Sequence, residues 1–133
     1  MRTVAEILDS KGPQFNNIDA AKTVFEALNV MKCENLSYVI VFSEGKYVGV
    51  FSENDYARKL ILSDKQSQNT PVSEVMSADL PMVTTTDSSK RCMKLMNLHK
   101  TRYLPVFDDF DFKGVITIHD LMREAITDAE QQE

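Results

Sequence analysis

Each half of the chain contains one segment in which mostly apolar residues recur at helical spacing. In both segments, the inward positions recur at i, i+3, i+4 and i+7, which places them on one side of a helix. The aligned positions are Val24, Ala27, Leu28 and Met31 in the first segment and Ser89, Cys92, Met93 and Met96 in the second. We call the shift that sets Val24 on Ser89 the repeat offset. The pattern predicts two equivalent helices, each with one buried face.

The repeat offset also aligns the runs 38–42 and 103–107, whose β-branched and aromatic residues favour strands. A polar turn follows each run, and a second apolar run comes next, at 47–51 or 114–116. Each half therefore contains a pair of strands joined as a hairpin. A further helix is predicted after each pair, with its apolar face formed by Tyr56, Ala57, Leu60 and Ile61 in the first half and by Leu121, Met122, Ala125 and Ile126 in the second.

Each half begins with a short first strand, at Ile18 in one and at Val83 in the other, so each follows the order β-α-β-β-α. The segments that lead into the halves, 4–8 and 72–76, match at a shift longer than the repeat offset, so the first half has three extra residues. A polar run that ends at Pro71 indicates a linker, because a proline disfavours helix before it. We therefore predict a first repeat with its lead-in at 1–64, a linker at 65–71, a second repeat at 72–128 and a tail at 129–133.

The chain has 133 residues, 43% of them hydrophobic, which is enough for one domain or for two small ones that share a core. A formal charge of -5 argues against binding to nucleic acid or an anionic membrane, although a local basic pocket is compatible with it. No apolar run approaches the length of a membrane span and no secretion signal is apparent, so we expect a cytoplasmic protein. Cys33 and Cys92 lack CxxC spacing, and we expect both to be buried thiols.

The strongest candidate for chemistry is a segment that occurs once in each half. It reads Gly-h-h-Ser/Thr-x-x-Asp, where h is apolar, at 49–55 and at 114–120. Each copy carries a predicted strand into a helix, whose first backbone N–H groups lack partners and attract an anion. The carboxylate can accept hydrogen bonds from both hydroxyls of a ribose, and the hydroxyl can satisfy a phosphate or the backbone. The residues concerned are Ser52 and Asp55 in the first copy and Thr117 and Asp120 in the second.

A helix cap is the alternative interpretation of the same residues. Serine and threonine are favoured N-cap residues, and an acid three positions later forms a capping box. A single segment of this kind favours the cap. The recurrence of glycine, hydroxyl and aspartate in register, within halves that otherwise share few identities, favours a ligand role in which the hydroxyls can also cap.

The two motif segments, together with 52–59 and 102–106, resemble the CBS-pair or Bateman-module family, named after cystathionine β-synthase. The resemblance extends over residues 4–126, and 52–59 resembles small free-standing bacterial members. It implies an α/β (α+β) fold of two tandem repeats, related by pseudo-two-fold symmetry and packed through their sheets, with two clefts. Such proteins bind AMP, ADP, ATP, NAD or S-adenosylmethionine, commonly form disc-shaped homodimers, and regulate rather than catalyse.

The resemblance also implies which residues contact the ligand. Asp55 and Asp120 match the ribose-binding aspartate. The base would be contacted by Ile18 and Val83 on the first strands and by Tyr38 and Tyr103 at the starts of the second strands. Many members have arginine immediately before the aspartate, whereas this chain has Asn54 and His119. We therefore expect unequal sites, with the Asp120 site better suited to a phosphate-bearing ligand.

Three further residues are candidates for phosphate contacts. Arg58 lies one turn after Asp55, and Arg102 precedes the second strand of its repeat. A solvated surface charge is the alternative for each arginine. His119, beside Asp120, can contact a phosphate or confer mild pH sensitivity.

Other chemistry is poorly supported by the sequence. The acidic segment from 109 to 120 has calcium-loop spacing, but Lys113 stands where an oxygen ligand is needed, so we predict no metal. Neither a nucleophile motif nor a phosphate-binding glycine loop is recognisable. We predict a non-catalytic module that needs no cofactor, senses an adenine nucleotide as a regulatory ligand, and acts as a homodimer on an unknown protein target. The alternative is a protein-interaction or oligomerisation module with vestigial ligand clefts.

Overall fold

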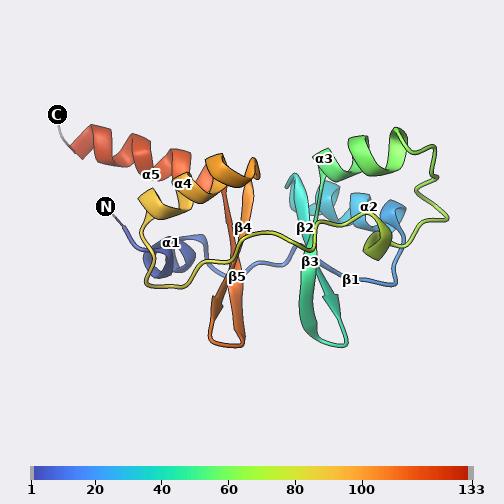
Figure 1. Ribbon diagram of the computed structural model, residues 1–133, viewed down its shortest axis with the longest axis horizontal. Helices are drawn as coiled ribbons and strands as arrows, with labels where there is room; N and C mark the ends of the chain where they lie inside the picture. The colour runs from blue at the N-terminus through green and yellow to red at the C-terminus, as the bar shows by residue number, and fades with distance from the viewer. Residues whose placement is uncertain (1, 132–133) are drawn as a thin grey trace. The chain divides into compact units, whose positions relative to one another are not determined.

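The computed structural model describes residues 2–131 and shows two compact units (Figure 1). One consists of Gln14–Asp79 and contains most of the first repeat, and we call it the repeat-1 unit. The other consists of the chain up to Pro13 together with the chain from Leu80 onward, and we call it the repeat-2 unit. Each unit combines helices with a small β-sheet, as the predicted α+β class requires.

The repeat-1 unit is built on a three-stranded sheet with the order β1-β2-β3. Strand β1 runs parallel to β2, and β2 pairs with β3 as an antiparallel hairpin. Its elements are β1 (Asn17–Asp19), α2 (Val24–Glu34), β2 (Tyr38–Ser43), β3 (Lys46–Ser52), α3 (Glu53–Asp55), a π-helical segment (Tyr56–Ile61) and a 3₁₀ turn (Val72–Glu74). The predicted order of strand, helix, strand and strand is confirmed here.

The repeat-2 unit follows the same plan, and its elements from α4 onward keep the repeat offset. Its elements are α1 (Val4–Lys11), α4 (Ser89–His99), β4 (Tyr103–Asp108), β5 (Asp111–Thr117) and α5 (Ile118–Gln131). Strands β4 and β5 form an antiparallel hairpin whose register shifts after Val106, as that of β2 and β3 shifts after Val41. The helices α2 and α4 and both hairpins therefore confirm the repeat found in the sequence.

The first strand differs between the two halves. Ile18 lies in a strand of three residues, whereas Val83 forms an isolated parallel bridge to β4. The short first strand predicted at Val83 is therefore reduced to this single bridge. In β2, Ile40 donates its N–H to the carbonyl oxygen of Asn16 (2.8 Å), but the equivalent residue of β4 is Pro105, which has no N–H to donate.

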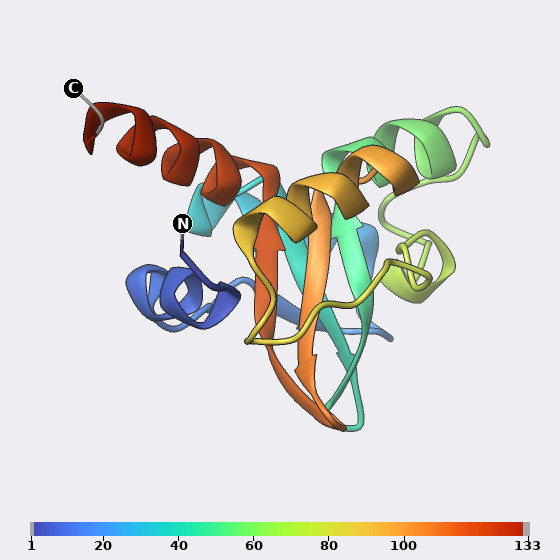
Figure 2. The same cartoon turned by 60° about the vertical axis from the view of Figure 1, so that its left-hand side comes forward.

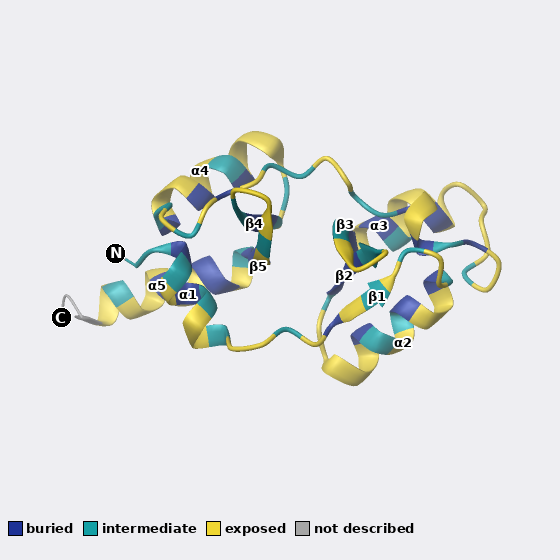
Figure 3. Cartoon of the chain, turned by 90° about the horizontal axis from the view of Figure 1, so that it is seen from below, coloured by how far each residue is buried: buried dark blue, intermediate teal, exposed yellow. Residues whose placement is uncertain are grey.

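Each unit has its own apolar core between its helices and one face of its hairpin (Figures 2 and 3). The predicted helix stripes are buried at three of their four positions, namely Val24, Ala27 and Met31 on α2 and Ser89, Cys92 and Met96 on α4. The fourth position lies at the margin of the stripe, where Leu28 is partly buried and Met93 is 43% exposed. The hairpins contribute Val39, Val41 and Phe51 to one core and Leu104, Val106 and Ile116 to the other.

The lead-in segment of each repeat packs on the core of the other repeat. The buried residues are Val4 and Ile7 in the first lead-in and Val72 and Val75 in the second. The N–H of Val4 donates to the carbonyl oxygen of Asp87 at 2.9 Å. The equivalent hydrogen bond joins Val72 to Lys22 at 2.8 Å. The first segments of the two repeats are therefore exchanged between the two units.

The boundaries of the two spatial units therefore differ from the boundaries of the two repeats in the sequence. The segment 65–71, predicted to be a linker, is bonded to the start of α2, where the N–H of Val24 donates to the carbonyl oxygen of Thr70 (2.9 Å). Helix α5 continues to Gln131, into the segment predicted to be a tail. The last two residues of that tail lie outside the described residues.

The helix after each hairpin differs from the prediction. After β3 the chain makes a short helix and then a π-helical segment, whereas after β5 it forms the regular helix α5. Of the predicted apolar faces, Leu60 and Leu121 are buried. The exposed members are Ala57, Ile61, Met122, Ala125 and Ile126. This part of the prediction is wrong because the inward side of α5 also carries Asp120 and Glu124, which turns the apolar residues outward.

Candidate functional site

The two motif segments occupy the same place in each unit, at the end of the hairpin and the start of the following helix. Ser52 of β3 pairs with Tyr38 at the start of β2. In the same way, Thr117 of β5 pairs with Tyr103 at the start of β4. Paired residues of antiparallel strands share one face of the sheet. The structure therefore brings the predicted tyrosines beside the motif hydroxyl residues.

In the repeat-1 unit, the carboxylate of Asp55 is buried and fully engaged by donors of the same chain. Its Oδ2 accepts a hydrogen bond from the N–H of Ser52 (3.0 Å), and its Oδ1 accepts one from the hydroxyl of Ser77 (2.8 Å). The ammonium of Lys59 lies 3.2 Å from Oδ1, and 44% of the lysine side chain is exposed. A buried carboxylate is thus neutralised by a cation that reaches it from solvent.

In the repeat-2 unit, Asp120 is buried more deeply and holds two cations. The ammonium of Lys11 donates to Oδ2 at 2.8 Å and also to the carbonyl oxygen of Val115 at 2.9 Å. The guanidinium of Arg123 donates to Oδ1, and 68% of its side chain is exposed. Oδ2 also accepts the N–H of Thr117 at 2.8 Å. The lysine side chain is 15% exposed, so Lys11 is largely enclosed by the protein, whereas Arg123 reaches Asp120 from solvent.

Both motif copies have the geometry of a capping box. The hydroxyl accepts the N–H of the aspartate, and the carboxylate accepts the N–H of the hydroxyl residue. Local structure also explains why glycine occupies the first position of each motif. A Cβ on Gly49 would lie 2.8 Å from the carbonyl oxygen of Ser77, and Gly114 has a φ of 146°, which favours glycine. A ligand interpretation must therefore rest on the surroundings of the carboxylates rather than on the triplet itself.

The side chain of Val83 is buried in its core, and that of Ile18 is partly buried and packs against its core. Successive side chains of a strand point to opposite faces, so Tyr38 and Val41 lie on opposite faces of β2. Ile18 pairs with Val41 and shares its face. The structure therefore does not bring Ile18 or Val83 to the sheet face that carries Tyr38 and Tyr103.

The cation predicted for the Asp55 site is exposed. Arg58 lies in the π-helical segment, and its neighbour Lys59 contacts the carboxylate. At the repeat offset, the counterpart of Arg58 is Arg123, which contacts the motif aspartate of its own repeat. The wider turn of a π-helix brings the residue at i+4 back over the carboxylate, whereas in α5 the residue at i+3 does so.

The other two predicted contacts lie near the start of α5. The carbonyl oxygen of Arg102 accepts the N–H of Ile118 (2.9 Å), and the arginine side chain is exposed and lines a groove beside α4. His119 is exposed next to Asp120. Both side chains therefore reach solvent close to the second motif.

Three residues near the motifs were not identified from the sequence. Lys11 and Ser77 come from the segments that follow the two lead-ins and are distant in sequence from the aspartates that they contact. The signal that could have found them is the match of the lead-ins themselves. Asn16 is 1% exposed and donates from Nδ2 to the carbonyl oxygen of Tyr38 (3.0 Å), while its Oδ1 has no hydrogen-bond partner in the described part of the chain.

The structure of residues 2–131 also bears on other kinds of chemistry. Within this range, no group of three or more His, Cys, Asp or Glu residues is placed to hold a metal ion, and no helix is suited in length and apolarity to crossing a membrane. Burial raises the pKa of the Cys92 thiol to about 11. Cys33 is exposed near the end of α2, so the expectation of two buried thiols is half wrong.

Comparison with known proteins places the chain among CBS-domain proteins. A family model described as the CBS domain matches residues 13–62 and 72–127. A solved protein with CBS domains from Burkholderia ambifaria is 33% identical, with a TM-score of 0.88 and 95% of both chains covered. The mitochondrial CBS domain-containing protein CBSX3 of Arabidopsis thaliana is 28% identical over 93% of this chain, which spans 65% of that protein's length. A hexameric CBS-CP12 protein from bloom-forming cyanobacteria, 22% identical, shares the fold with a TM-score of 0.77 over 90% of this chain and 70% of that one.

Proposed function

Because the chain belongs to the CBS-domain family, we propose that it is a regulatory module that binds an adenine nucleotide and catalyses no reaction of its own. The observation that supports this most directly is the pair of buried carboxylates at equivalent helix starts, each contacted by an exposed cationic side chain. Such a carboxylate can exchange its cation for the hydroxyls of a ribose. The proposed location is the cytoplasm.

In the proposed complex, the ribose hydroxyls donate to Asp120 or Asp55, and the displaced cation turns to the phosphate. Arg123 and Lys59 are exposed enough to make this movement. The base lies toward the sheet face that carries Tyr103 or Tyr38. The first-strand residues Ile18 and Val83 then contact the base through their backbone. His119 and Arg102 add positive or polar contacts in the second repeat, so the Asp120 site binds phosphate-bearing ligands better.

Binding at Asp120 would also act on helix α1. Lys11 lies at the end of α1 and donates a hydrogen bond to Asp120. A ribose hydroxyl that bonds the same carboxylate oxygen would weaken this contact between α1 and Asp120. A ligand shifts a conformational equilibrium only by its difference in affinity for the two states. The proposed signal is therefore a change in the position of α1, which a protein target or a second copy of the chain can read.

The second candidate function is a protein-interaction or oligomerisation module with vestigial clefts. The observation that favours it is the capping geometry, which accounts for the motif without any ligand. Exposed apolar residues on α4 and α5 offer a surface for self-association, namely Met93, Leu98, Met122 and Ile126. A homodimer is compatible with both functions, so oligomeric state alone does not separate them.

Calorimetric titration and thermal shift separate the two functions. The panel is AMP, ADP, ATP, NAD, S-adenosylmethionine and coenzyme A, each added to protein whose folding is checked by circular dichroism. The sensor function predicts saturable heat and a higher melting temperature with at least one adenosine-containing ligand, because binding to the folded state stabilises it. No response across the panel from folded protein would favour the interaction module, and turnover of a bound nucleotide would show that the module is an enzyme.

A further inference from the structure

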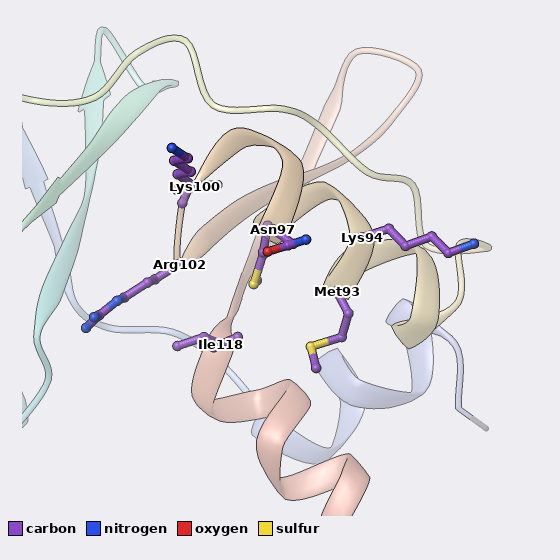
Figure 4. A pocket seen from close by; sticks show the side chains of 8 residues that line it. Met93, Lys94, Asn97, Lys100, Arg102 and Ile118 are labelled. Atoms are coloured by element: carbon purple, nitrogen blue, oxygen red, sulfur yellow. The ribbon is translucent and has the colours of Figure 1, made fainter.

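Each unit contains a groove at the same place, between the main helix, the loop that follows it and the start of the next helix. In the repeat-2 unit the groove has a volume of about 660 Å³ and is lined by Met93, Met96, Asn97, Lys100, Arg102 and Ile118, among others (Figure 4). The groove of the repeat-1 unit has a volume of about 410 Å³. Its lining includes the counterparts of these six residues at the repeat offset. The repeat thus supplies two versions of one cavity.

The two grooves differ in charge. Lys100 and Arg102 of the larger groove replace an asparagine and a serine of the smaller one, and Ile118 replaces the acidic Glu53. In the opposite sense, Asn97 replaces the basic Lys32. Figure 4 shows Met93 extending from α4 toward the start of α5, where Ile118 lies, while Lys100 and Arg102 project from the loop after α4. The larger groove therefore combines an apolar floor with a positive margin.

This margin belongs to the most basic segment of an acidic chain. Residues 88–102 contain five of the 15 lysines and arginines and no aspartate or glutamate. The equivalent segment 23–37 contains two glutamates and one lysine. Because the whole chain has a formal charge of -5, positive charge is concentrated here against the overall balance. A segment of this kind attracts anions.

Lys100 occupies a backbone position that disfavours it. It follows the last turn of α4 with a φ of 54° and a ψ of 44°, in the left-handed region. Its counterpart Asn35 has nearly the same angles, and asparagine tolerates this region much better than lysine does. A cation at a helix end is favourable by itself, but His99 already lies in the last turn of α4. The strained position is thus occupied by a residue that adds charge to the groove margin.

We propose that the groove of the repeat-2 unit binds a small amphipathic anion, specifically a soluble phosphate monoester with an apolar tail or ring. The apolar part lies against Met93, Met96 and Ile118, and methionine side chains adapt readily to different apolar shapes. The phosphate is bound by Lys100 and Arg102. A volume of about 660 Å³ is within the range of small-molecule sites. Asp120 does not line this groove, so the groove does not include the proposed ribose contact, and Arg102 is the residue that it shares with the proposed nucleotide site.

Octyl phosphate below its micelle concentration is a suitable probe, with inorganic phosphate and 1-octanol as its two half-ligands. Binding is followed through the methionine methyl signals in NMR spectra of protein labelled at those groups. We expect saturable shifts of the Met93 and Met96 signals with octyl phosphate, weaker shifts with either half-ligand, and weaker binding as salt is raised. Absence of shifts at millimolar octyl phosphate, or retention on phosphatidic acid vesicles without binding of the soluble probe, would overturn the proposal.

The smaller groove supplies the substitutions for the decisive comparison. The double variant Lys100→Asn, Arg102→Ser introduces the residues of the first repeat and should weaken octyl phosphate binding about tenfold, because two cations next to the phosphate are lost. A double variant with Lys46→Ser and Lys113→Asn removes the same charge outside the segment 88–102 and should bind like the original chain. Equal affinity in both double variants would overturn the proposal. The variant Asp120→Ala should keep octyl phosphate binding, so failure of the nucleotide proposal and failure of this one give different results.

Discussion

Replacing Lys11 with methionine tests how the second motif aspartate is held. The ammonium of Lys11 lies 2.8 Å from Asp120 Oδ2 and 2.9 Å from the carbonyl oxygen of Val115, with 15% of the side chain exposed. A hydrogen bond to a charged group contributes about 1.5–3 kcal/mol. Asp120 keeps Arg123 and the N–H of Thr117, so the carboxylate is not left unpaired. We therefore expect the free energy of unfolding to fall by about 2 kcal/mol.

The same substitution should strengthen nucleotide binding at the Asp120 site. In the native chain a ribose hydroxyl that bonds Oδ2 competes with the ammonium of Lys11, and in the variant only the N–H of Thr117 still bonds that oxygen. If removal of Lys11 lowers the free-energy cost of ribose binding by about 1.4 kcal/mol, the nucleotide affinity rises tenfold. Urea unfolding measures the loss of stability, and calorimetric titration with the nucleotide that binds the native chain measures the gain.

Lys59→Met is the matched control for this experiment. Its side chain is 44% exposed, so its ion pair with Asp55 should contribute about 0.2–1 kcal/mol. It should leave affinity at the Asp120 site unchanged. A Lys11→Met variant with native stability would show that the buried ion pair contributes nothing. A fall in its nucleotide affinity would show that Lys11 holds the ligand rather than competing with it.

Two further predictions concern the motif glycine and the thiols. Gly49→Ala should lower the free energy of unfolding by about 1–3 kcal/mol in urea, because the new Cβ would lie 2.8 Å from the Ser77 carbonyl oxygen; a neutral result would contradict this close approach. In native protein, iodoacetamide should label Cys33 readily and leave Cys92 unlabelled up to about pH 9, because burial raises the Cys92 pKa to about 11 and only the thiolate reacts. Equal labelling of the two cysteines, checked by peptide mass, would show that Cys92 is accessible.

The repeated elements were predictable from the sequence because each depends on local periodicity. The stripes on α2 and α4 and the two hairpins recur at one offset, and the structure confirms them. The shortened first strand of the second half was not predicted, although its cause, Pro105, is visible in the sequence. The outward apolar side of α5 was misjudged because periodicity alone does not show that Asp120 turns inward.

The surroundings of the motif aspartates were less predictable because they depend on contacts between distant segments. Lys11 is 109 residues from Asp120 in the sequence, and Ser77 is 22 residues from Asp55. Both reach their aspartates because each lead-in segment packs on the core of the other repeat. The sequence shows that the two lead-ins match each other, and their longer shift reflects three extra residues in the first half. The packing that it produces could not be derived from periodicity.

The most direct test of nucleotide binding is calorimetric titration of Asp55→Ala and Asp120→Ala beside the native chain, at a temperature where all three are folded. Thr23→Ala and Ser88→Ala serve as controls, because they remove the N-cap hydroxyls of α2 and α4, at a cost of about 1 kcal/mol, and leave both motifs in place. The sensor function predicts that each aspartate variant loses binding at its own site, with the larger loss of phosphate-bearing ligand in Asp120→Ala, while the controls bind as before. Nucleotide affinity and stoichiometry equal to those of the native chain in both aspartate variants would contradict it.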